Sequence, residues 1–209
     1  MLLLLACASA PVGPPCLPIT PIDADLAIRV WRGQGVPAAP TERLEAWWAA
    51  EGLRLRISAE GERAIGDALG PADGVTSEAR RAAVIAPLRA LLAPADGTVH
   101  LLVVARVAAP DSPMLHLLPE LDGLALTPLS PADDPIRALF PLDGVAPLVV
   151  VAQDAGTEVV AHELGHALGL GHDADPRSVM AATRARGCRP TLTTAQRAQL
   201  KDALAVLGR

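Results

Sequence analysis

The sequence predicts a mixed α/β (α+β) domain. The chain has 209 residues, which suits one domain and is long enough to bury a core. Segments with the apolar alternation of strands are followed by segments with helical start and stop signals, and a helix is expected at the end. Because the chain contains one Phe, three Trp and no Tyr, its core must be built from Ala, Leu and Val.

The N-terminal half predicts a strand, a helix and a second strand. In residues 25–31, "DLAIRVW", apolar residues alternate with polar or small ones as they do in a strand. In the next segment, "PTERLEAWWAAEG", Pro40 and Thr41 form a helix start signal and Gly52 a stop signal. Residues 53–57, "LRLRI", alternate strictly, so their arginines should point away from the core.

The remaining elements alternate in the same way. A helix is expected at about residues 77–92, shortened or kinked by Pro87. Residues 98–107 and 147–153 are nearly continuous apolar runs, which suit strands in the interior of a sheet. Frequent Pro and Gly between 108 and 147 leave room only for a short strand at 122–128. A last helix is expected at 192–208, capped by Thr193 or Thr194.

Residues 1–22 predict an export segment and a tether that precede a folded domain at 23–209. The start, "MLLLLACASAPVGPPC", has a short apolar run followed by small residues, as export signals have. The sequence "LLAC" resembles a bacterial lipobox, in which Cys7 would carry a lipid and attach the protein to a membrane. The alternative is an ordinary signal cleaved near Ala10. We therefore expect an exported protein, either a lipoprotein of the bacterial cell envelope or an extracellular protein.

The cysteine count agrees with export. If Cys7 is lipidated or removed, Cys16 and Cys188 remain as an even pair that would form a disulfide in an oxidising compartment. Two unpaired thiols are the alternative.

Charge and hydropathy exclude some partners. The net charge of −5 and the pI near 5.5 argue against a nucleic-acid partner, which would need a basic face. No apolar run reaches the roughly 18 to 20 residues of a membrane span. We expect a monomer.

Three of the five histidines lie within residues 162–172, "HELGHALGLGH". On a helix, His162 and His166 stand one turn apart on one face, so both imidazoles can reach a single ion. Glu163 lies slightly around the helix, where it can meet a water molecule on the metal without being a ligand. Gly169 suits the left-handed residue that ends a helix, and the turn after it returns His172 toward the same ion. The motif predicts zinc.

This motif resembles that of the metzincin metallopeptidases, which continues to a Met-turn. Met180 lies eight residues after His172, a spacing similar to that of the matrixin branch. The resemblance implies a zincin domain with a mixed twisted sheet, an active-site helix, a Met-turn and a C-terminal helix. It also implies that Met180 lies beneath the three imidazoles and that residues 23–209 form the catalytic domain.

The chain departs from the matrixin pattern at several positions. Asp173 follows the third histidine, where matrixins have serine, and Ala181 and Ala182 replace the Tyr-Pro that follows the matrixin methionine. A tyrosine that assists catalysis in astacins and serralysins has no counterpart, since the chain contains no Tyr. The wall of the S1′ pocket should therefore differ from that of matrixins.

These residues predict a zinc-dependent endopeptidase that hydrolyses protein or peptide substrates. Zinc-bound water would attack the scissile carbonyl, with Glu163 as the base. The alternatives are a non-catalytic zinc module and a zinc hydrolase of non-peptide amides. Structural zinc usually has four protein ligands, and Asp173 is a poor fourth ligand because it adjoins His172.

The other candidate ligands are expected to have no role in the site. His100 should be a strand residue and His116 a loop residue, and two histidines cannot form the structural zinc site of matrixins. Calcium is possible at Asp133 and Asp134, but no loop has the ligand spacing of a calcium site. "PPCLPIT" around Cys16 does not match the inhibitory cysteine sequence of matrixins.

Overall fold

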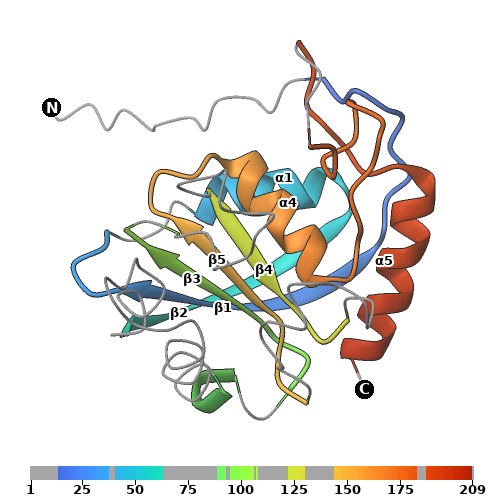
Figure 1. Cartoon of the computed structure of the whole chain (residues 1–209). Helices are drawn as coiled ribbons and strands as arrows, with labels where there is room; N and C mark the ends of the chain where they lie inside the picture. The colour runs from blue at the N-terminus through green and yellow to red at the C-terminus, as the bar shows by residue number, and fades with distance from the viewer. Residues whose placement is uncertain are drawn as a thin grey trace, which may run out of the picture.

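A computed structural model of the chain describes residues 14–37, 41–63, 89–92, 95–105, 107, 122–129, 144–182 and 187–208. Within these ranges the protein is a five-stranded mixed sheet with helices, which confirms the predicted α/β class (Figure 1). No helix in the described ranges has the length and apolar content needed to cross a bilayer.

The sheet consists of five strands in the order β2-β1-β3-β5-β4. Their bounds are β1 Ala24–Gly33, β2 Leu53–Arg63, β3 Val99–Val104, β4 Gly123–Leu126 and β5 Leu148–Ala152. Strands β2, β1, β3 and β5 run parallel, and β4 pairs antiparallel with β5. The sheet therefore ends in one short antiparallel strand, which lies beside helix α4 (Thr157–Ala167).

All five strands are found where predicted, and the bounds of β2 and β3 differ most from the predicted ranges. β2 continues to Arg63, although apolar alternation stops at Ile57, because its pairing with β1 continues through a register shift at Val30 and Trp31. β3 is shorter than predicted and ends at Val104. All residues of β3 and β5 are buried, as expected for central parallel strands covered on both faces.

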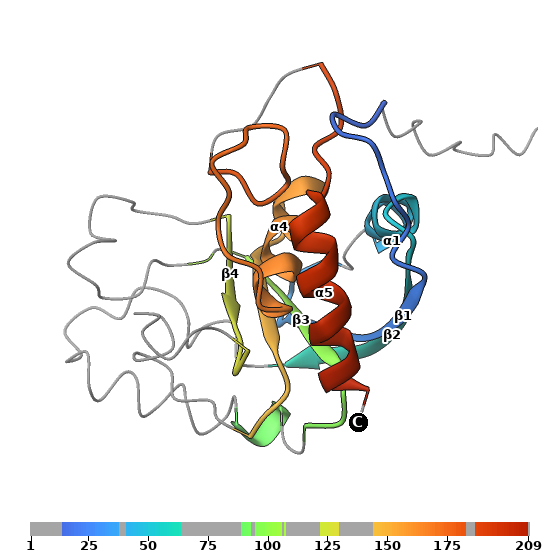
Figure 2. The ribbon, with the colours of Figure 1, turned by 90° about the vertical axis from the view of Figure 1, so that its right-hand side faces the viewer.

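One face of the sheet packs against helices α1 (Thr41–Ala50), α4 and α5 (Thr194–Leu207). The core on this face joins residues of β1, β3 and β5 to Trp47 and Trp48 of α1, Leu164 of α4 and Leu200 of α5. In both views α4 lies between β4 and α5 (Figure 1 and Figure 2). α4, which carries the first two histidines, packs against β4, β5 and α1.

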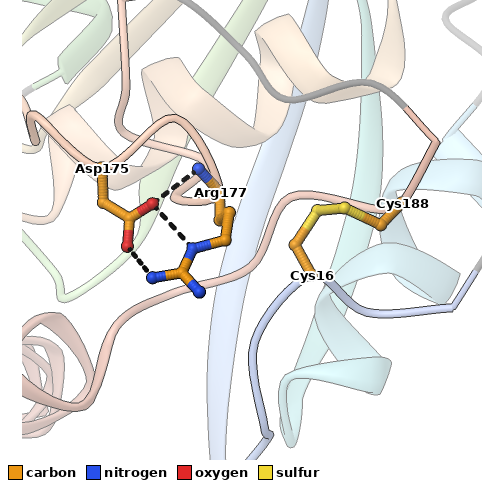
Figure 3. The surroundings of a disulfide bond; sticks show 4 residues. All are labelled: Cys16, Asp175, Arg177 and Cys188. Carbon is orange, nitrogen blue, oxygen red and sulfur yellow. Dashed lines mark hydrogen bonds and ion pairs between the residues drawn. A yellow bond between two sulfur atoms is a disulfide. The ribbon is translucent and has the colours of Figure 1, made fainter.

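The described part of the N-terminal segment lies on the folded domain. Cys16 forms a disulfide with Cys188, which confirms the pairing that the cysteine count allowed (Figure 3). The backbone of Cys16 also donates to the carbonyl of Arg189, and Ile22 is buried in the core. Residues 14–22, expected to be a tether, are thus held by a covalent bond and by apolar burial.

Several expectations concern residues outside the described ranges. These are the lipid on Cys7, the loop position of His116, calcium at Asp133 and Asp134, and residues 77–88 of the helix expected at 77–92. They stay predictions. Of that helix, residues 89–92 are described and are helical.

Candidate metal centre

Helix α4 places His162 and His166 on one face and then ends as predicted. Gly169 has a φ of 85°, in the left-handed region. Its N–H donates to the carbonyl of His166, and the N–H of Leu170 donates to the carbonyl of Gly165. This is the Schellman arrangement, which ends a helix and reverses the chain direction. The reversal brings His172 back to the first two histidines.

The three histidines converge on one point. Nε2 of His166 lies 3.0 Å from Nε2 of His162 and 3.2 Å from Nε2 of His172. Zinc bound tetrahedrally by imidazoles at 2.0–2.1 Å would hold the nitrogens about 3.3 Å apart. Among the described residues, these histidines form the one group of three or more possible ligands. The spacing of the nitrogens therefore fits zinc.

Two of the three imidazoles are oriented by backbone carbonyls. Nδ1 of His162 lies 2.7 Å from the carbonyl oxygen of Val179, and Nδ1 of His166 lies 2.8 Å from that of Leu170. Since a carbonyl only accepts, each Nδ1 must donate, and in the neutral ring the lone pair is then on Nε2. Nitrogen lone pairs facing each other at this distance are stabilised by a cation between them. The donor chemistry thus fits a metal as well.

The three histidines, which we call the histidine tripod, differ in their exposure to solvent. His162 is buried, His166 half-buried and His172 exposed. A metal held by these rings would be reached from solvent on the side of His172. Because the His162 ring is buried away from water, its hydrogen bond to the Val179 carbonyl is stronger than it would be at the surface.

Met180 lies against α4 and is fully buried. Its Sδ fills the space that a Cβ on Gly165 would need, so a side chain at position 165 would overlap it. Gly165 lies between the two helical histidines in the sequence, and the methionine is therefore packed under the segment that carries them.

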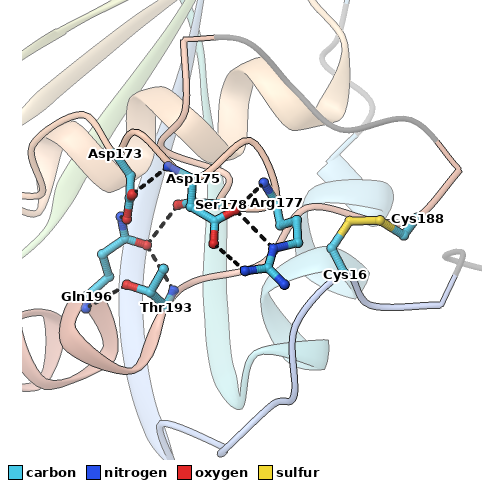
Figure 4. Close-up of polar contacts among 8 residues, drawn as sticks. All are labelled: Cys16, Asp173, Asp175, Arg177, Ser178, Cys188, Thr193 and Gln196. Carbon is cyan, nitrogen blue, oxygen red and sulfur yellow. Dashed lines mark hydrogen bonds and ion pairs between the residues drawn. A yellow bond between two sulfur atoms is a disulfide. The ribbon is translucent and has the colours of Figure 1, made fainter.

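A hydrogen-bond network joins the segment after His172 to α5 (Figure 4). Gln196 donates through Nε2 to Asp173 Oδ2 at 2.9 Å and accepts at Oε1 from Ser178 Oγ at 3.0 Å. Ser178 Oγ in turn accepts from the N–H of Met180, and the N–H of Asp173 donates to the carbonyl of Met180. The network ties Asp173, the turn that holds Met180 and the C-terminal helix α5 into one unit.

Sequence reasoning missed this role of Gln196. The available signal was the pattern Thr193-x-x-Gln196 at the start of α5, which forms a capping box and confirms Thr193 as the cap. Asp173, considered as a fourth ligand, instead accepts from Gln196 at Oδ2 and from the N–H of Asp175 at Oδ1.

Glu163 is half-buried on α4 and faces β4. A Cβ built on Gly123 of β4 would lie 2.6 Å from Glu163 Cγ and 3.4 Å from Glu163 Oε1. Glu163, which follows His162 in the sequence, is therefore in close contact with the backbone of β4.

His100 lies outside the site, as expected. It is buried in β3, and its Nδ1 accepts from Trp31 Nε1 at 2.9 Å. Burial, and secondarily the positive charge of Arg29, lower the pKa of His100 below its usual 6.5. Its environment favours a neutral structural residue.

The mixed sheet, the central helix and the three converging histidines resemble the fold and motif of metzincin-like zincins, and comparison with known proteins finds the same similarity. Residues 151–198 match the matrixin family, peptidase family M10. No curated protein sequence matches the chain.

The solved structures with a similar fold include the following two. Archaemetzincin from Methanopyrus kandleri has 16% identity and a TM-score of 0.54, over 87% of this chain and 96% of that one. Metalloproteinase-II from Bacteroides fragilis has 13% identity and a TM-score of 0.52, over 92% of this chain and 58% of that one. The resemblance to the metzincins that the motif predicted is thus found again in the fold.

Proposed function

We propose that this protein is a zinc-dependent endopeptidase that hydrolyses proteins or peptides. The observation that carries the proposal is the convergence of three imidazole Nε2 atoms, two of them from the helix that also carries the half-buried Glu163. The matrixin match over this segment supports the same reaction class.

His162, His166 and His172 would hold the metal. Zinc bound there would supply a Lewis acid that polarises the scissile carbonyl and lowers the pKa of water toward roughly 7. The Val179 and Leu170 carbonyls would keep two of the rings in the tautomer that presents Nε2. Met180 would form an apolar floor beneath the rings, which agrees with its burial against Gly165.

Glu163 would carry the protons of the reaction. As a carboxylate it accepts a proton from the attacking water, and it then delivers that proton to the amine that leaves. Glu163 adjoins His162 and lies one turn from the C-terminal end of α4. This position suits the role, because Glu163 is next to a proposed ligand but does not belong to the group of converging histidines.

The substrate would bind as an added strand. β4 pairs with β5 on one side and is the last strand in the sheet order. An extended peptide along its outer edge would hydrogen-bond to the β4 backbone and pass close to Glu163.

The two alternatives predict different behaviour with substrates. A non-catalytic zinc module would bind zinc and cleave nothing, and a hydrolase of non-peptide amides would leave peptides intact. A fourth protein ligand would favour the first alternative, but both carboxylate oxygens of Asp173 are engaged elsewhere. Among the described residues no fourth ligand joins the three histidines, so a metal held there would keep a position for water, which favours catalysis.

The test is the substitution Glu163→Gln in the zinc-loaded protein. We expect unchanged zinc content and a loss of cleavage of a mixed peptide library of at least about a hundredfold, because the amide cannot accept a proton. Glu158→Gln, in the first turn of the same helix, is the matched control and should cleave normally. An active Glu163→Gln variant would refute the assignment of the base. Wild-type protein that holds zinc and cleaves no peptide would refute the endopeptidase.

A further inference from the structure

The contact between Gly123 and Glu163 joins the end strand of the sheet to the proposed base. β4 lies against α4, and the position of a Cβ on Gly123 is 2.6 Å from Glu163 Cγ and 3.2 Å from Glu163 Cδ. Carbon atoms in ordinary contact are about 3.5 to 4.0 Å apart. Any side chain at position 123 would therefore occupy space that the glutamate now fills.

The backbone of β4 does not itself require glycine at this position. Gly123 is absent from the residues with positive φ, so other residues can adopt its conformation without strain. Gly within a strand is also unfavourable relative to Ala, because it loses more backbone entropy and packs no side chain. What glycine provides here is room for Glu163.

The side of β4 that faces α4 is built from small residues only. Leu124 and Leu126 belong to the core on the opposite face of the sheet, whereas Ala125 packs against the core that contains α4. Gly123 shares the face of Ala125 because alternate residues of a strand point the same way. The strand therefore has no bulky side chain on the face where Glu163 lies.

We propose that Gly123 is a positioning residue for Glu163: its missing side chain sets where the carboxylate stands relative to the histidine tripod. This inference rests on the proposed function for its catalytic consequence. Glu163 has a flexible side chain, so an added Cβ would move the glutamate rather than the strand. The chain would then fold and bind zinc while holding its base out of place.

The kinetic test is Gly123→Ala in the zinc-loaded protein. We expect kcat to fall roughly ten- to a hundredfold, because a displacement of about 1 Å in a reacting group has this effect, with KM within about twofold. Zinc content should be unchanged. Gly123→Ser, which adds the same Cβ, should behave alike. The control is Gly156→Ala at the N-cap of α4, where φ is −66° and an added Cβ meets nothing within 4 Å.

A second readout does not depend on activity. Thermal unfolding is measured for Gly123→Ala in the wild-type background and in a Glu163→Ala background. The substitution should lower Tm, or leave it unchanged, when Glu163 is present. It should raise Tm when the glutamate side chain is absent, because Ala is then simply the better strand residue.

These measurements separate failure of the inference from failure of the proposed function. An active wild type with an equally active Gly123→Ala variant overturns the positioning role, as does an identical Tm change in both backgrounds. If the wild type cleaves nothing, the endopeptidase proposal fails, and the two Tm changes alone decide whether Gly123 sets the position of Glu163.

Discussion

At the scale of single residues, the partner of each imidazole decides its role. His162 Nδ1 donates to a backbone carbonyl and directs Nε2 toward His166, whereas His100 Nδ1 accepts from Trp31 and remains within the sheet. Both rings are buried. Burial alone therefore does not distinguish a ligand from a structural histidine, but the direction of the hydrogen bond does.

His100 predicts a pH dependence of stability. Its pKa is lowered in the folded protein, chiefly by burial and also by Arg29, with Asp96 and Glu60 acting in the opposite direction. Below pH 6.5, the ordinary value, the unfolded chain therefore binds more protons than the folded one. The stability that neutral His100 contributes is complete above that pH and is lost as pH falls toward the lowered pKa.

The measurement is the fall in Tm between about pH 7.5 and about pH 5.5, taken in EDTA so that zinc release contributes nothing. We expect a smaller fall in His100→Gln, because its amide oxygen can accept from Trp31 Nε1 and does not titrate in this range. Equal falls in the wild type and the variant would show that His100 does not titrate differently on folding.

At the scale of elements, features set within one helix could be predicted from the sequence. The separation of His162 and His166 follows from the helical repeat, and the positive φ of Gly169 from the geometry of a helix end. The return of His172 then needs only a short turn. These features depend on local backbone geometry, which residue types such as glycine reveal.

Features that depend on tertiary pairing could not be predicted. The carbonyl of Val179 that orients His162 leaves no trace in residue type, since every residue has a carbonyl. The polar half of β2, up to Arg63, is a strand because β1 pairs with it. Gln196 likewise shows a capping pattern in the sequence, but its bond to Asp173 requires the fold to bring together two residues that are 23 positions apart.

Gln196 provides a test of how α5 supports the metal centre. Gln196→Ala removes the bonds to Asp173 and Ser178, so the segment that carries His172 and Met180 should loosen. Loss of such an outer partner typically lowers metal affinity about 10- to 100-fold. Zinc affinity, measured by competition with a chelator, should fall by this factor. Lys201→Ala, exposed on the same helix, is the control, and unchanged affinity in Gln196→Ala would contradict the supporting role.

At the scale of the whole molecule, the segment after Met180 is tied twice to parts of the chain that lie far before it in the sequence, first to Cys16 and then to Glu51. The first link is the Cys16–Cys188 disulfide. The second is a buried ion cluster, in which Glu51 contacts Arg189 at 2.8 Å and Arg197 at 2.6 Å. Charged residues are mostly exposed, so the residue types alone do not indicate this cluster. Both links therefore fix the part of the chain that follows the proposed active site, at Cys188, Arg189 and Arg197.

The disulfide predicts a stability that depends on reduction. It joins residues 172 positions apart, and removing such a link typically costs about 2–4 kcal/mol, a loss on the order of 10 °C in Tm for a chain of this size. In a Cys7→Ser background, which prevents exchange with the third thiol, a reductant should lower Tm by this amount. The Cys16→Ser/Cys188→Ser variant should melt at the lower temperature with or without reductant. Zinc binding should survive at room temperature, because Glu51 at the end of α1 still holds Arg189 and Arg197. If the reductant does not change the Tm of the protein with both cysteines, the two sulfurs are not bonded in solution. If reduction releases zinc, the ion cluster alone cannot hold the metal centre together.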